Sequence, residues 1–198
     1  MKRKAAVAIW LVFIFTGIGC TFWYKEWVYS LPTSLPANYK SVGTGAYIDF
    51  RTTIHTDSTK PVFLHFFNPD CPCSKFNMAH FKSIVKLYND NVNFAIVVLS
   101  SKHYGEKDIQ EKFGITLPVF FDSSIAARCG VYSTPQAVII DTAHQMFYRG
   151  NYNRTRYCTD KKTEYAKTAL TALLHRNTIQ FDQYALKAYG CQLPKCTN

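Results

Sequence analysis

The feature that most constrains the fold of this chain is an uncharged, mostly apolar run of 20 residues at positions 5–24. As an α-helix this run would extend about 30 Å, which matches the hydrocarbon core of a bilayer. Three basic residues precede it at positions 2–4, and aromatic residues cluster at its far end, at positions 22, 23, 24 and 27. The pattern predicts a single-pass membrane anchor within residues 1–29, with its amino terminus inside the cell and the rest of the chain exported.

Two other interpretations of this segment remain open. A cleaved signal peptide would have the same basic start, but no A-x-A cleavage site follows the apolar run. Cys20 follows Gly17-Ile18-Gly19 and is a weak candidate for lipid modification, because the usual branched aliphatic residue is missing at Gly17.

The rest of the chain is long enough for one substantial hydrophobic core. The whole chain has 198 residues, of which 47% are hydrophobic and 18% charged. The formal net charge is +10, but no run of five Lys or Arg occurs, so nucleic-acid binding is not indicated. Pro and Gly among Ser and Thr predict a linker over 30–60, followed by one globular domain over 61–176 and a tail over 177–198.

Short β-rich runs alternate with helical spacing after the linker, which favours an α/β domain. A strand over 61–67, a helix through 76–87 and a strand over 92–100 predict a parallel βαβ unit. The later expected elements are a helix over 105–113, a strand over 118–121, a helical turn over 124–129, a hairpin of 136–141 with 146–150, and a helix over 162–174.

The most informative motif is Cys71-Pro72-Cys73-Ser74, at the point where a buried strand leads into a helix. If Pro72 takes the first helical position, Cys71 becomes the N-cap residue, and its sulfur faces the unpaired amides of Cys73 and Ser74. Those amides and the helix dipole favour thiolate over thiol, and Lys75 adds to the effect, whereas the neighbouring Asp70 opposes it. Cys71 is therefore the predicted nucleophile for thiol-disulfide exchange.

The sequence leaves three roles open for Cys73. It can resolve a mixed disulfide formed at Cys71, provided that it lies close to the loop, because successive helix side chains diverge by about 100°. Alternatively it points inward as a small apolar residue, or it pairs with Cys129.

The strand, the Cys-Pro-x-Ser turn and the later segment Thr134-Pro135 before an apolar strand together resemble the thioredoxin-fold redoxins, a group that includes the alkyl hydroperoxide reductase and thiol-specific antioxidant-like proteins. The resemblance implies a mixed central sheet flanked by helices. It also implies a cis-proline loop at Thr134 and Pro135 that presents a backbone edge to substrates. His65 stands where thioredoxins carry a buried carboxylate, which implies a role in proton transfer.

The sequence departs from the redoxin pattern at several positions. Ser74 occupies the place of the second cysteine of a CxxC motif, so the standard exchange cycle is in doubt, and Asp70 replaces the usual aromatic residue. Peroxide-reducing relatives carry Pro and then Thr or Ser where this chain has Leu64 and Asn68. Peroxidase activity is therefore less favoured.

Six cysteines follow the anchor, and an exported location permits disulfides between them. Cys191 and Cys196 lie close in sequence, while Cys129 and Cys158 flank the expected hairpin, which suggests two structural disulfides. A different interpretation makes Cys191 a resolving thiol that folds back onto Cys71. Six cysteines allow fifteen pairings, so the sequence leaves both open.

These observations predict a membrane-anchored thiol-disulfide oxidoreductase of a bacterial inner membrane, with its carboxy-terminal domain in the periplasm. Its expected partners are protein thiols or disulfides and a thiol electron donor, with no nucleic acid, no cofactor and no metal. The alternative is a Cu(I)-binding chaperone that uses Cys71 and Cys73 with His65 or His80, or a module that keeps the fold without turnover.

Overall fold

The computed structural model describes residues 2–49, 54 and 57–193. The chain separates into two compact units, Met1–Pro32 and Thr33–Asn198. The first contains helix α1 (Lys2–Ser30), within which Arg3–Val28 is long and apolar enough to cross a membrane. The apolar amino-terminal helix predicted from the sequence is therefore present.

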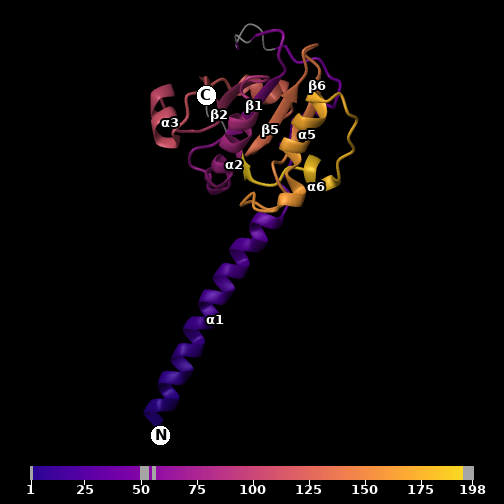
Figure 1. The fold of residues 1–198 in the computed structure, drawn as a ribbon. Coiled ribbons are helices and arrows are strands. Elements are labelled where there is room, and N and C mark those ends of the chain that lie inside the picture. The colour runs from indigo at the N-terminus through magenta and orange to yellow at the C-terminus, as the bar shows by residue number, and fades with distance from the viewer. Residues whose placement is uncertain (1, 50–53, 55–56, 194–198) are drawn as a thin grey trace. The chain divides into compact units, whose positions relative to one another are not determined.

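The second unit is a five-stranded mixed sheet with helices on both faces, which confirms the predicted thioredoxin-like fold class. The strand order is β3-β2-β1-β5-β6; β1, β2 and β3 run parallel, and β5 and β6 are antiparallel to their neighbours. Figure 1 shows α2 and α5 packed beside β1 and β5. The elements are β1 (Val62–Phe67), α2 (Pro72–Tyr88), β2 (Asn93–Val98), α3 (Glu106–Phe113), β3 (Val119–Phe120), α4 (Ser123–Arg128), β4 (Ser133–Thr134), β5 (Gln136–Ile140), β6 (Met146–Gly150), the 3-10 turn η1 (Lys161–Thr163), α5 (Tyr165–Leu174), α6 (Gln183–Leu186) and β7 (Cys191–Gln192).

The central strands are apolar on both faces because both faces are covered. Phe63 and Phe67 of β1 join a first core with side chains of α2, α3 and α5. Leu64 and Phe66, which point the other way, join a second core with α4. A continuous apolar run is therefore what a strand in this position requires.

Local sequence signals fix where α2 begins and where α3 ends. Cys71 is the N-cap of α2, with extended backbone, and Pro72 opens the helix as the sequence predicts. Gly114 ends α3 in the left-handed conformation (φ 58°), which glycine adopts without a steric penalty.

Segments predicted as linker and tail also pack on this unit. The N–H of Thr33 donates to the carbonyl of Ala188 (2.9 Å), and Ile48 is buried in the second core. Ala185 and Ala188 of the tail are fully buried. The ordered unit thus reaches beyond residues 61–176 at both ends.

Candidate functional site

The site begins where the central strand β1 ends and α2 starts, at the carboxyl end of β1. The N–H of Cys71 donates to the carbonyl of Asn68 (3.1 Å), and the carbonyl of Cys71 accepts from the N–H of Lys75 (3.2 Å). The N–H of Asn68 donates to the hydroxyl of Ser74 (3.2 Å), which is fully buried. These bonds hold Cys71 at the helix start, where the residue is 3% exposed.

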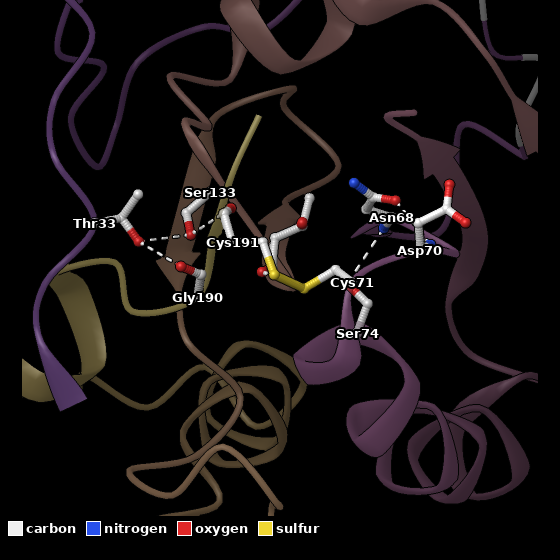
Figure 2. Close-up of a disulfide and its surroundings, with 9 residues drawn as sticks. Thr33, Asn68, Asp70, Cys71, Ser74, Ser133, Gly190 and Cys191 are labelled. Carbon is white, nitrogen blue, oxygen red and sulfur yellow. Dashed lines mark hydrogen bonds between the residues drawn. A yellow bond between two sulfur atoms is a disulfide. The ribbon is translucent and has the colours of Figure 1, made fainter. Parts of the chain in front are cut away.

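Cys71 forms a disulfide with Cys191 of β7, 120 residues further along the chain. Figure 2 shows this bond joining the start of α2 to the tail strand. The expected contact of the Cys71 sulfur with the amides of Cys73 and Ser74 is absent, because no side-chain cap bond forms at α2. The sulfur instead points toward β7 and lies 3.7 Å from the carbonyl oxygen of Thr134.

The tail strand is held by backbone pairing and by two hydroxyl groups. β7 pairs antiparallel with β4, which places Cys191 opposite Thr134. The hydroxyl oxygens of Ser133 and Thr33 lie 2.9 Å apart and share a hydrogen bond, and they lie 3.2 Å from the carbonyl oxygens of Cys191 and Gly190, respectively (Figure 2). Gly190 fits this junction because a Cβ there would lie 2.4 Å from the Thr134 carbonyl oxygen.

The loop predicted to contain a cis-proline has that conformation. The Thr134–Pro135 peptide bond is cis, and it lies between β4 and β5. The carbonyl of Thr134 faces the Cys71 sulfur, so the loop and the helix start meet at the disulfide. A substrate-binding role for Thr134 and Pro135 stays a prediction, and in this structure β7 occupies the β4 edge.

Cys73 lies on the first turn of α2, buried, and is not disulfide-bonded. Its sulfur and those of Cys71 and Cys191 all lie within 4.8 Å of one another. We call these three atoms the sulfur cluster. The predicted closeness of Cys73 to the loop is observed, whereas its role as a resolving thiol stays a prediction.

Asp70, expected to oppose a thiolate at Cys71, is engaged by other groups. Its carboxylate accepts hydrogen bonds from Lys102 (3.0 Å), Tyr104 (3.0 Å) and Ser100 (3.3 Å). The bond from Lys102 holds the pKa of Asp70 below its usual value. The carboxylate is therefore balanced by a cation that the sequence analysis did not identify.

His65 lies in the first core beside the aromatic side chains. Its ring stacks on Phe81 (4.2 Å between centroids), and its Nδ1 shares a 2.7 Å hydrogen bond with the hydroxyl of Tyr152. Complete burial lowers the pKa of His65 to about 3, so the ring is neutral at neutral pH. Its part in proton transfer stays a prediction.

The remaining cysteines after the anchor do not form the suggested structural disulfides. Cys129 is buried in the second core, whereas Cys158 packs against the first, on the other face of the sheet, and both are reduced. Because the sulfur of Cys191 is bonded to Cys71, it is not bonded to Cys196, which lies outside the described residues. Burial raises the pKa of both the Cys129 and Cys158 thiols to about 12.

Sequence reasoning missed the residues that place the tail. Thr33 and Ser133 were not singled out, because a hydroxyl that bonds a backbone carbonyl 157 or 58 residues further along the chain leaves no local signal. Tyr152, the hydrogen-bond partner of His65, was not singled out either. Cys191 was identified from the sequence, but its partner was open between Cys71 and Cys196. The pairing of β7 with β4 decides between them.

Comparisons with known proteins match this architecture. A family model described as a domain of unknown function (DUF6436) matches residues 44–194, a range that includes Cys71, Cys73, Pro135 and Cys191. No curated protein matches the chain.

Three of the solved structures that are similar to this chain are the following. A hypothetical protein from Sinorhizobium meliloti 1021 superposes with a TM-score of 0.63 at 14% identity, covering 78% of this chain and 96% of that one. An uncharacterized conserved protein from Geobacillus kaustophilus gives 0.59 at 20%, covering 71% and 79%. The thioredoxin domain of a thiol-disulfide oxidoreductase from Bacteroides vulgatus gives 0.47 at 13%, covering 62% and 98%.

Proposed function

We propose that this chain, which belongs to the DUF6436 family, is a thiol-disulfide oxidoreductase acting on protein thiols or disulfides outside the cytoplasm. The observation that carries the proposal is the disulfide between Cys71, at the start of α2, and Cys191, beside the cis-proline loop. A cysteine at a helix start is favoured as thiolate by the helix dipole, which is what a nucleophile in exchange needs.

In the reducing direction, the Cys71 thiolate attacks one sulfur of a substrate disulfide. A mixed disulfide forms, and the other substrate sulfur leaves as a thiolate that takes up a proton. The Cys191 thiolate then attacks the Cys71 sulfur, releases the second substrate thiol and re-forms the Cys71–Cys191 disulfide. A thiol electron donor reduces this disulfide for the next cycle.

The position of Cys191 supports its role as the resolving thiol. It reaches Cys71 on a strand that is antiparallel to β4, the geometry by which an extended peptide adds to a sheet edge. Cys73, whose sulfur lies within 4.8 Å of both bonded sulfurs, is the other candidate resolving thiol. A substrate strand at Thr134 and Pro135 requires β7 to leave that edge first.

The test is reduction of insulin by the full chain in detergent, fed by a dithiol, together with trapping of mixed disulfides. Cys71→Ser abolishes both reduction and trapping, because no nucleophile remains. Cys191→Ser accumulates a mixed disulfide at Cys71, because the resolving step is missing. The same accumulation in Cys73→Ser alone assigns resolution to Cys73, and undiminished turnover by Cys71→Ser refutes the proposal.

We further propose that α1 anchors the chain in a bacterial inner membrane with residues 30–198 in the periplasm. The basic residues at positions 2–4 and the aromatic residues at positions 22–24 and 27 support this orientation. A phosphatase that is active only outside the cytoplasm, fused after residue 198, is expected to be active and to sediment with membranes. An inactive fusion contradicts the orientation, and a soluble one contradicts the anchor.

A further inference from the structure

We propose that the sulfur cluster, once reduced, is a binding site for one Cu(I) ion held by Cys71, Cys73 and Cys191. Among the described residues, these three cysteines bring their ligand atoms within 4.8 Å of one another. The site requires the disulfide to be opened first: two thiols of a donor are oxidised to a disulfide, and Cys71 and Cys191 take up the two electrons and two protons. The inference does not depend on exchange activity.

The spacing of the sulfur atoms fits one ion. Three sulfurs around a metal at about 2.3 Å lie about 4 Å from one another. Sulfur atoms that are no longer bonded separate to van der Waals contact, which is close to that spacing. Separation of the two bonded sulfurs to contact distance therefore brings the cluster to the spacing of a trigonal site.

The kind and number of ligands favour Cu(I). Thiolates are soft ligands that select Cu(I) and zinc, and zinc prefers four ligands where the cluster provides three. Cys71 and Cys73 are each 3% exposed, whereas Cys191 is half-buried, so two of the three ligands are shielded from water. No amide at the start of α2 bonds the Cys71 sulfur in the disulfide form, but the positive end of the helix dipole lies at Cys71 and Cys73 and favours their thiolates.

The third ligand is a cysteine from the tail, not either histidine considered from the sequence. His65 directs its Nδ1 to Tyr152 in the first core, and the Nδ1 of His80 lies 3.7 Å from Glu164. Cys191, in contrast, is positioned by the pairing of β7 with β4 and by the Ser133 hydroxyl. These contacts hold the ligand near the site after the disulfide is reduced.

The experiment uses the full chain in detergent, with Cys20→Ser as background, because Cys20 is an exposed thiol. The chain is reduced with a phosphine, freed of it without oxygen, and titrated with the coloured Cu(I)-bicinchoninate complex. The reduced chain is expected to take up one equivalent of Cu(I), and X-ray absorption to show three sulfur neighbours at about 2.3 Å. The disulfide form is expected to take up none.

Cys73→Ser and Cys191→Ser each lower the affinity for Cu(I) by more than about tenfold. Cys129→Ala and Cys196→Ser are the controls and leave it unchanged, Cys129 being a buried thiol of the second core. Near-ultraviolet circular dichroism checks that each variant is folded. The inference is overturned if the reduced chain takes up no Cu(I) or the disulfide form takes up as much as the reduced form. It is also overturned if Cys191→Ser keeps full affinity for Cu(I) or Cys196→Ser loses it.

Exchange activity is measured separately, with a copper chelator present. If insulin reduction depends on Cys71 and no copper binds, this inference fails alone. If copper binds and Cys71→Ser retains exchange, the proposed function fails alone.

Discussion

The cysteines of the sulfur cluster and the packed thiols Cys129 and Cys158 have the same side chain but different surroundings. The first group gathers at a helix start, beside a cis-peptide loop and a strand from the tail. The packed thiols lie on opposite faces of the sheet among apolar side chains, and burial raises the pKa of each to about 12. Cysteine chemistry in this chain is therefore set by position in the fold and not by residue type.

The most direct test of this difference between the two groups is to replace one cysteine of each. Cys71→Ser is expected to lower the rate of insulin reduction by on the order of 10³-fold or more, because the attacking sulfur is gone. Cys129→Ala is the matched variant and is expected to keep the rate. Equal losses in the two variants, with both folded, would remove the distinction.

Alkylation rates test the same contrast without substitution. After mild reduction, Cys71 is expected to react with iodoacetamide at least about 10³-fold faster than Cys129 or Cys158, because a thiol with a pKa of about 12 is ionised that much less than an ordinary one. Mass spectrometry of timed, quenched samples measures each site. Comparable rates at the three positions in the folded protein would contradict the assignment of reactivity.

A substitution at Gly190 tests whether the docking of β7 on β4 stabilises the Cys71–Cys191 disulfide. In Gly190→Ala the new Cβ meets the Thr134 carbonyl, so β7 docks less well and the equilibrium constant for the Cys71–Cys191 disulfide falls about tenfold, or about 1.4 kcal/mol. Titration against a glutathione redox buffer measures it. Gly43→Ala is the control, because a Cβ there meets nothing within 4 Å; equal shifts in both variants would contradict this account of the tail.

The smallest expected effect concerns His65, whose pKa of about 3 lies below the 6.5 of an unfolded chain. The unfolded state then binds a proton that the folded state excludes. The contribution of neutral, buried His65 to the free energy of unfolding is therefore complete above pH 6.5 and is lost as the pH falls toward 3. Between pH 7 and pH 5.5 the free energy of unfolding is expected to fall by about 1 kcal/mol more in the native chain than in His65→Gln. Denaturant melts at each pH measure this difference, and parallel curves would refute it.

The exchange rate of His65→Gln as a function of pH tests the predicted proton transfer separately. A changed pH profile in a folded variant supports that role, since a residue that contributes packing alone would leave the profile in place. An unchanged profile removes it.

The amino-acid sequence by itself determined the elements and the motif. The continuous apolar runs predict the central strands, Pro72 predicts the start of α2 with Cys71 as its N-cap, and the uncharged run at positions 5–24 predicts the amino-terminal helix. These are local signals, because chain geometry and side-chain chemistry within a few residues suffice to produce them.

Tertiary structure alone decided which sulfur atoms meet. Cys191 lies five residues from Cys196 and 120 from Cys71, yet strand pairing at β4 and hydrogen bonds from Ser133 and Thr33 bring it to Cys71. The same packing places Cys129 and Cys158 on opposite faces of the sheet and gives Asp70 a cation partner in Lys102. Such contacts join segments distant in sequence, so no local pattern encodes them, and they exist once the whole domain has folded.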